Sequence, residues 1–324
     1  MIAFAATTDV GNCRANNEDL YVILPDLPTP QTDFAKRRSA VVVLDGHGGI
    51  RAASFVRQFF ETEFISSEHY GVNTAKALEA CVQTLDKRFL ELARKQHWLT
   101  DGTTLVAVVI EDTPNERKLT TANVGDSRAI FISPHHTREI TIDQNAARSD
   151  EAFRVYDSGG FVSFTNRYRP PPTALVRPLR CLRHIVDGWN KWVQHRPLRV
   201  YPGGLAVTRS IGDLDCKQAG VVICDAECVE YVLTSQAKCQ QDTSASSGLI
   251  IASDGVWGVE STHTVWRCVS KQLKTRCSLQ ERADIMSTSV VSLAKLHPRS
   301  TDNITAVAVV FDQIYHLRNV TSLQ

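Results

Sequence analysis

Short runs of apolar, mostly β-branched residues recur along the chain and predict buried β-strands. A polar loop, Glu111–Lys118, separates two of these runs and contains Pro114 and Asn115, so we predict that the two flanking strands form an antiparallel hairpin. The predicted strands are Ala40–Leu44, Leu105–Ile110, Leu119–Val124, Ala129–Ile132, Leu249–Ala252 and Ile304–Phe311.

Two longer segments repeat apolar residues at helical spacing, which predicts amphipathic helices. One face of the first helix carries Leu78, Cys81, Val82, Leu85, Phe89 and Leu92, and one face of the second carries Ala283, Met286, Val290, Leu293 and Ala294. Strands in clusters, with long helices set apart from them, indicate the α+β class, with sheets covered by helices.

The segment Phe164–Leu198 departs from this pattern because it is rich in proline and arginine and contains a single acidic residue, Asp187. We interpret residues 1–324 as a single domain in which this segment, at about 164–198, is an inserted surface flap with a basic face. A solvated loop without a role is the alternative, although long ordered loops are commonly functional.

Composition narrows the classes of function. The 324 residues are 43% hydrophobic with a formal charge of +1, which permits a sizeable core and indicates neither a nucleic-acid partner nor a membrane surface. Nine cysteines without a Cys-x-x-Cys pair predict free thiols in a reducing compartment, and no long apolar run predicts a membrane span. We expect a monomer, located in the cytoplasm or nucleus. The basic triplet Lys36-Arg37-Arg38 is too short for a strong nuclear signal, and we interpret it as a solvated loop.

Aspartates stand at the ends of the predicted buried strands. Asp45 follows Val-Val-Val-Leu, Asp126 follows Asn-Val-Gly, Asp254 follows Ile-Ile-Ala-Ser, and Asp302 precedes the last strand. A carboxylate at such a place is costly unless it is paired or binds a metal ion. If these residues converge, together with Glu18-Asp19, they form an all-oxygen anionic cluster that suits Mg²⁺ or Mn²⁺ rather than Zn²⁺.

Seven short motifs stand in one order along the chain and resemble the signature of the protein phosphatase 2C family. They are Arg14-x-x-Asn17-Glu18-Asp19, Asp45-Gly-His-Gly-Gly, Gly102-Thr-Thr, Ala122-Asn-Val-Gly-Asp-Ser-Arg128, Leu205-Ala-Val-Thr-Arg-Ser-Ile-Gly-Asp213, Ala252-Ser-Asp-Gly-Val-Trp257 and Asp302-Asn-Ile-Thr305. The resemblance implies a four-layer αββα sandwich, in which two antiparallel β-sheets are flanked by helices and the metal site lies at one end.

The resemblance also implies roles for individual residues. Asp45, Asp254, Asp302 and the Gly46 carbonyl resemble direct ligands of two Mg²⁺ or Mn²⁺ ions, and Glu18 and Asp19 would act largely through waters on those ions. Arg14 resembles the phosphate-binding arginine, His47 the general acid, and Asp126 a ligand of a third, weaker ion. Gly258 stands where many relatives carry an aspartate, so we predict two well-occupied metal sites and a third that fills only at high metal concentration.

The implied activity is hydrolysis of phosphoserine and phosphothreonine in phosphorylated proteins. A water or hydroxide bridging the metals would attack phosphorus, while Arg14 binds the phosphate and His47 protonates the leaving group. One alternative is a catalytically silent phosphoprotein-binding pseudophosphatase, and another is a hydrolase of small phosphomonoesters or nucleotides. The complete aspartate set favours the active phosphatase, and Arg128 and Arg209 resemble structural arginines held in salt bridges.

Overall fold

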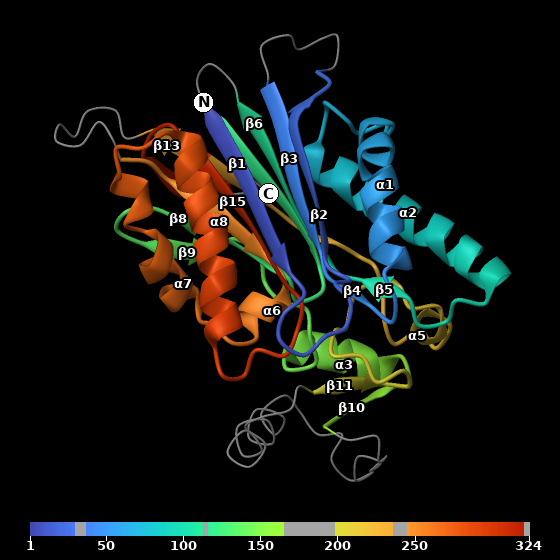
Figure 1. The fold of residues 1–324 in the computed structure, drawn as a ribbon. Coiled ribbons are helices and arrows are strands. Elements are labelled where there is room, and N and C mark those ends of the chain that lie inside the picture. The colour runs from blue at the N-terminus through green and yellow to red at the C-terminus, as the bar shows by residue number, and fades with distance from the viewer. Residues whose placement is uncertain (30–36, 113–115, 165–197, 236–244, 321–324) are drawn as a thin grey trace.

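Two antiparallel sheets pack face to face in the computed structural model (Figure 1), which describes residues 1–29, 37–112, 116–164, 198–235 and 245–320. The five-stranded sheet contains, in spatial order, β1 (Ile2–Asp9), β15 (Ile304–Phe311), β14 (Gly248–Ala252), β8 (Arg128–Ile132) and β9 (Thr137–Glu139). The six-stranded sheet contains β16 (Tyr315–Asn319), β13 (Glu227–Ser235), β7 (Arg117–Val124), β6 (Leu105–Asp112), β3 (Arg37–Leu44) and β2 (Leu20–Leu27).

Helices cover the outer face of each sheet, as Figure 1 shows. The five-stranded sheet is covered by α6 (Asp254–Trp257), α7 (Thr262–Val269), η1 (Gln272–Lys274) and α8 (Leu279–Leu296). The six-stranded sheet is covered by α1 (Arg51–Ile65) and α2 (Thr74–Gln96). This arrangement confirms the predicted α+β class and the four-layer αββα sandwich.

The central strands are apolar without interruption because they are buried on both faces. In β3, Val41 and Val43 pack into the core between the two sheets, whereas Ala40, Val42 and Leu44 pack against α1 and α2. All eight residues of β15 are buried in the same way. The hydrophobic runs therefore report the strands directly, while the choice of face follows from the pleat.

The predicted strands and helices are all present, and the predicted hairpin is the antiparallel pair β6–β7. The pattern missed β1, β2 and β13, whose residues are mostly half-buried and do not form a continuous apolar run. One local interpretation was wrong: Arg38 does not lie in a solvated loop but in β3, where it is 2% exposed and donates from Nε to Glu111 Oε1 at 2.9 Å.

A smaller lobe lies at the lower end of the sandwich in Figure 1 and is built from α3 (Ser149–Asp157), β10 (Phe161–Ser163) and β11 (Arg199–Tyr201). The predicted flap, 164–198, begins after β10, and all of it except its two end residues lies outside the described residues. Beside this lobe, β4 (Gly46–His47), β5 (Gly102–Thr103) and β12 (Ile211–Gly212) form a three-stranded sheet, followed by α5 (Leu214–Gln218).

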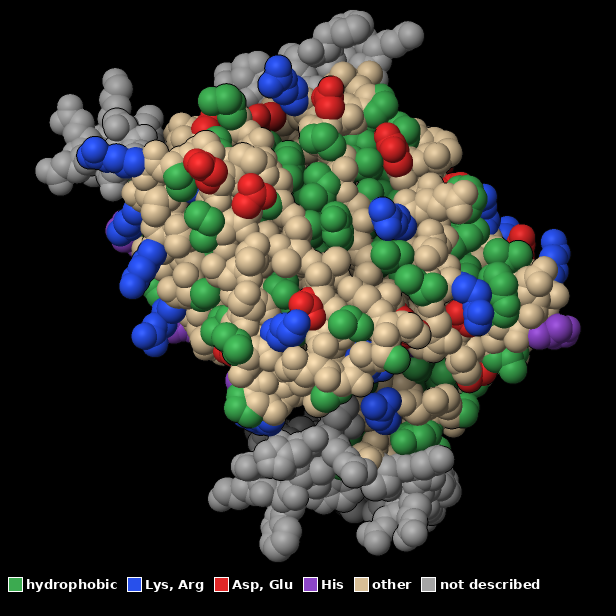
Figure 2. All heavy atoms as spheres, viewed as in Figure 1, with side chains coloured by type: hydrophobic (Ala, Val, Ile, Leu, Met, Phe, Trp, Pro, Cys, Tyr) green, Lys and Arg blue, Asp and Glu red, His purple; other side chains and the backbone are tan. Residues whose placement is uncertain are grey.

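The described surface agrees with the even charge balance of the sequence. On the face drawn in Figure 2, basic and acidic side chains are interspersed among apolar and uncharged atoms. The cysteines that the structure describes are all free thiols. Among the described helices, none combines the length and the apolar character needed to cross a bilayer.

Candidate metal and phosphate site

Three of the predicted aspartates converge at the end of the sandwich. Asp45 follows β3, Asp126 lies in the turn after β7, and Asp254 is the first residue of α6, directly after β14 and Ser253. Each offers a carboxylate oxygen, and these oxygens lie within 4.8 Å of one another. Gly255 permits this approach, because a Cβ there would lie 1.8 Å from the carbonyl oxygen of Asn303. Three half-buried carboxylates this close repel one another and are suited to holding a cation.

Asp19 extends the cluster inward and is 3% exposed. Its Oδ2 accepts a hydrogen bond from Ser253 Oγ at 2.7 Å, and Ser253 Oγ in turn accepts from the Thr305 backbone N–H at 3.1 Å. The other carboxylate oxygen, Oδ1, is buried and has no hydrogen-bond partner in the described structure. An unsatisfied buried oxygen beside an anionic cluster suits a water held by a metal ion.

Asp302 and Arg14 lie at the open side of the cluster. Arg14 donates from Nη2 to Asp302 Oδ2 at 2.8 Å, and both side chains are partly exposed. Asn303 fixes the loop, since its amide donates to the carbonyls of Val10 and Asn16 at 2.9 Å and its Oδ1 accepts from the Glu18 backbone N–H at 2.9 Å. The Asn303 side chain thus joins the segments that carry Arg14, Glu18 and Asp302, a positioning role that sequence reasoning missed.

The electrostatics of the cluster show an excess of negative charge. Burial raises the pKa of Asp45 well above its usual range, and the charges of Asp254 and Asp19 add to this. Burial and the Asp254 carboxylate likewise raise the pKa of Asp126. Burial, opposed by the Ser253 hydrogen bond and reinforced by Asp254 and Asp302, raises the pKa of Asp19 to about 7. The residues present therefore fit a bound divalent cation, which would relieve this repulsion.

Stability of the metal-free protein should depend on pH in a direction set by these raised values. A carboxyl group whose folded pKa is raised stabilises the fold while protonated, and that contribution is lost as pH rises from its unfolded value, 3.8, through its folded value, about 7 for Asp19. We expect the Tm in chelator to fall between about pH 4 and pH 7, and Asp45→Asn to lessen the fall by about 2–4 °C, the shift for roughly 1 kcal/mol in a domain of this size.

Differential scanning calorimetry checks this expectation by comparing the pH slope of Tm for wild type and Asp45→Asn, because titrations outside the cluster cancel in the difference. Added Mn²⁺ should reduce the pH slope of Tm in the wild type, because the bound ion relieves the repulsion between the carboxylates. Parallel slopes for the two proteins in chelator would contradict an electrostatically strained cluster.

His47 stands at the edge of the site in β4. Its Nε2 lies 2.8 Å from Oδ2 and 3.0 Å from Oδ1 of Asp213. Burial alone would lower the pKa of His47, but the charge and hydrogen bond of Asp213 outweigh it, and the net shift is upward. Asp213 belongs to one of the sequence motifs but received no role from the sequence, because nothing local in Ile-Gly-Asp reveals a partner 166 residues away.

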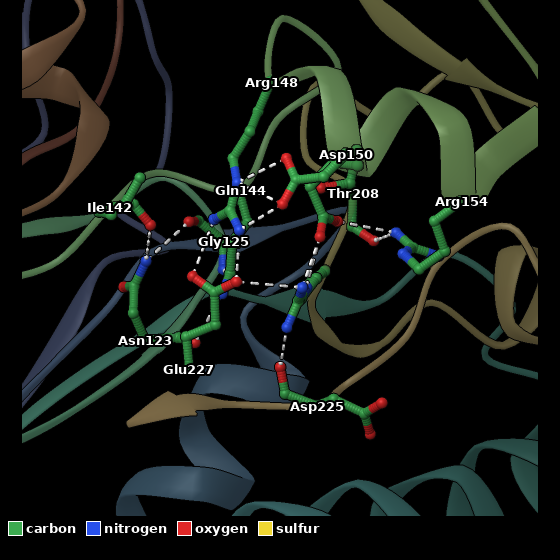
Figure 3. A network of polar contacts seen from close by, with 12 residues as sticks. Asn123, Gly125, Ile142, Gln144, Arg148, Asp150, Arg154, Thr208, Asp225 and Glu227 are labelled. Carbon is green, nitrogen blue, oxygen red and sulfur yellow. Dashed lines mark hydrogen bonds and ion pairs between the residues drawn. The ribbon is translucent and has the colours of Figure 1, made fainter. Parts of the chain in front are cut away.

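The turn that carries Asp126 is held from the neighbouring loop, part of which Figure 3 shows. Gln144 is fully buried; its Oε1 accepts from the Gly125 N–H at 2.8 Å and its Nε2 donates to the Asn123 carbonyl at 3.1 Å. Arg128 makes a bidentate ion pair with Asp143, with N–O distances of 2.9 and 2.7 Å. The role of Arg128 as a structural arginine is thereby confirmed.

Arg209 is also structural and belongs to an ion-pair network between α3 and β13. It binds Glu151 and Glu227, and Arg148 binds Glu227 and Asp150. These three acidic residues lie close enough to suggest a second metal site. However, the arginines already neutralise them, so this cluster is an ion-pair network between the small lobe and the sandwich (Figure 3).

Known proteins share this architecture and sequence pattern. The structure superposes on a crystal structure of serine-threonine phosphatase 2C from Toxoplasma gondii with a TM-score of 0.67 at 18% identity, covering 95% of this chain and 94% of that one. The sequence is 28% identical over 280 residues to probable protein phosphatase 2C 59 of Oryza sativa subsp. japonica (85% of this chain, 67% of that protein). It is 29% identical over 278 residues to the mitochondrial protein phosphatase 1K of Xenopus laevis (83% and 60%).

The αββα sandwich with aspartates clustered at one end is the architecture of metal-dependent phosphatases. The family model described as protein phosphatase 2C matches residues 6–304, and this chain belongs to that family. The alignments span 55–67% of the length of the first three curated relatives.

Proposed function

We propose that this protein is a Mg²⁺- or Mn²⁺-dependent serine/threonine phosphatase that acts on phosphorylated proteins. The observation that supports this most strongly is the convergence of Asp45, Asp126 and Asp254, with Arg14 at the open side of the same site. A purely sequestering module would have no need of such mutually repelling carboxylates, which cost stability unless they hold a cation.

The chain offers ligands for two ions through Asp45, the Gly46 carbonyl, Asp254 and Asp302, with Glu18 and Asp19 acting through water. When bound, the ions supply positive charge against the phosphate and a coordinated water of lowered pKa as the nucleophile toward phosphorus. The sparse carboxylate set and the unpartnered Oδ1 of Asp19 support hard ions that keep several waters.

Arg14 and His47 supply the remaining chemistry. One guanidinium nitrogen of Arg14, Nη2, donates to Asp302. The other two make no hydrogen bond to described residues, so they can donate to two phosphate oxygens. His47 makes no hydrogen bond from Nδ1 within the described residues, and this nitrogen can donate its proton to the departing serine or threonine oxygen. An alkoxide is a strong base, and its protonation lowers the barrier.

Turnover of a phosphoserine peptide with Mn²⁺ and with chelator tests the proposal. We expect sustained hydrolysis with Mn²⁺ that chelator abolishes, and a preference for the peptide over a free nucleotide. Binding of the peptide without turnover would establish the silent binding protein instead, and equal or faster hydrolysis of the nucleotide would establish a small-molecule phosphatase.

The third metal site should remain weak and should respond to Gly258. This residue is exposed, closes α6 with φ −71°, and therefore does not require glycine for its backbone conformation. A new Cβ would lie 2.9 Å from the Asp254 carbonyl oxygen, which requires a small local shift. We expect Gly258→Asp to tighten Mn²⁺ binding beside Asp126 by about tenfold, the lower end of what a supporting carboxylate contributes.

Anomalous diffraction from crystals soaked at low and high Mn²⁺ measures occupancy at that site. Gly258→Ala is the matched control, since it introduces the same Cβ contact without the carboxylate and should leave the third ion weak. Full occupancy of a third ion on wild-type Asp126 in the low soak would show that Gly258 has no influence.

A further inference from the structure

We propose that Asp213 is the positioning residue for His47: its buried carboxylate binds the ring at Nε2 and so fixes Nδ1 as the nitrogen that donates to the leaving group. The inference rests on the proposed function for its catalytic meaning, but the pairing itself can be measured without turnover.

The hydrogen bonds of Asp213 and His47 show which part of the imidazole ring is bound and which part is accessible. Both Asp213 oxygens lie within 3.0 Å of His47 Nε2, and Ser210 donates from Oγ to Asp213 Oδ2 at 2.5 Å. Asp213 is 1% exposed, whereas the His47 side chain is 27% exposed. The carboxylate therefore forms the inner wall, and solvent or substrate reaches only the ring edge that it does not bind.

The backbone at Asp213 has a conformation that few non-glycine residues adopt, although aspartate and asparagine tolerate it best. Its φ and ψ are 52° and 59°, in the left-handed region, and among the described residues only His97 shares a positive φ without being glycine. The Asp213 N–H donates to the Asp101 carbonyl at 2.8 Å. Such local strain is typical of sites that need one side chain at one place.

The three-stranded sheet β4–β5–β12 brings the pair together. His47 stands opposite Gly102, and Gly102 stands opposite Gly212, the residue before Asp213. The middle residue must be glycine, because a Cβ on Gly102 would lie 2.1 Å from Asp213 Oδ2 and 2.4 Å from His47 Nε2. The histidine and the carboxylate thus meet directly above a position that has no side chain.

A matched control is Asp86, another buried carboxylate that binds the strand β12. It lies on α2, is 5% exposed, and accepts hydrogen bonds from the Gly212 N–H at 2.8 Å and from Lys217 Nζ at 2.7 Å. Asp86 therefore supports β12 without touching His47. A merely structural role for Asp213 would make both carboxylates behave alike.

The test compares kcat for a phosphoserine peptide and for an aryl phosphate in Asp213→Asn, His47→Gln, the double variant and Asp86→Asn. Asparagine keeps the shape of aspartate and tolerates left-handed backbone, so the fold should persist. We expect Asp213→Asn to slow the peptide by about 10–100-fold and the aryl phosphate by less than about threefold, because only the alkyl leaving group needs the positioned acid. The double variant should match His47→Gln alone, as coupled residues are not additive.

Asp86→Asn should slow both substrates to the same extent or not at all. Equal losses on the two substrates in Asp213→Asn, or additive losses in the double variant, would overturn the proposal. If Asp213→Asn fails to fold, Ser210→Ala takes its place. It removes only the hydroxyl donor to Asp213 and should give the same selective loss, larger for the peptide than for the aryl phosphate, by a smaller factor. Equal losses on the two substrates in Ser210→Ala would overturn the proposal as well.

A spectroscopic readout separates this proposal from the proposed function. The proton on His47 Nε2 should give a downfield resonance at fixed pH, assigned by its absence in His47→Gln, which disappears in Asp213→Asn and persists in Asp86→Asn. Persistence of that signal in Asp213→Asn would overturn the pairing. If the signal is lost in Asp213→Asn but the wild-type protein hydrolyses no phosphate ester, the pairing is upheld and the proposed phosphatase activity is refuted.

Discussion

Replacement of Asp254 by alanine should abolish hydrolysis at saturating Mn²⁺, with kcat lowered by at least about 10³-fold. Asp254 lies in the aspartate cluster with Asp45 and Asp126, and its charge also acts on Asp302 and Arg14, so one substitution removes the ligand that we propose the ions share. Loss of a metal that stabilises several kcal/mol of developing charge translates into tenfold in rate for each ~1.4 kcal/mol. Steady-state kinetics on a phosphoserine peptide measures the effect.

Asp312→Ala provides the control, because Asp312 also stands at an end of β15 but on the side away from Asp302, where it pairs with the chain amino group and Arg117. It should retain near wild-type turnover. Circular dichroism and Tm in chelator should show that Asp254→Ala is folded, and its metal-free form should be at least as stable as wild type, since a like charge is removed. Wild-type rates in Asp254→Ala at saturating Mn²⁺ would refute the metal-site assignment.

Replacement of His47 by glutamine should discriminate between leaving groups. We expect kcat on a phosphoserine peptide to fall by about 10²-fold or more, the usual contribution of general acid catalysis, and kcat on an aryl phosphate to fall far less. The aryl leaving group is a weaker base and departs without a proton. Parallel kinetics on the two substrates, with the same enzyme preparation, measures the difference.

The pH dependence of the wild type checks the same assignment. Burial lowers the pKa of His47, but the charge and hydrogen bond of Asp213 outweigh it, so the ring keeps its proton to a higher pH than an ordinary histidine. Peptide turnover should therefore decrease at alkaline pH as pH passes the raised pKa, and His47→Gln should lose that decrease. Equal losses on both substrates, or an unchanged alkaline limb in the variant, would show that His47 is not the general acid.

The sequence alone determined the fold class, and it did so through burial. Strands buried on both faces leave no polar alternation, so β3 and β15 are continuous apolar runs that the pattern exposes. The aspartates that follow or precede such strands, and the motifs that contain them, were sufficient to indicate the family and its oxygen-ligand chemistry. The pattern missed β1, because its buried residues Ala3 and Ala5 alternate with half-buried ones and form no continuous apolar run.

Partnerships across the chain were decided only by the tertiary structure. Arg14 meets Asp302 over 288 residues, Ser253 meets Asp19 over 234, and His47 meets Asp213 over 166. Sheet order and register, rather than local propensity, set each of these contacts, because a side chain's neighbour is chosen by the strand that pairs beside it. The wrong interpretation of Arg38 has the same cause. A basic triplet predicts a solvent-exposed loop, but pairing of β3 with β6 places Arg38 opposite Glu111 in the interior.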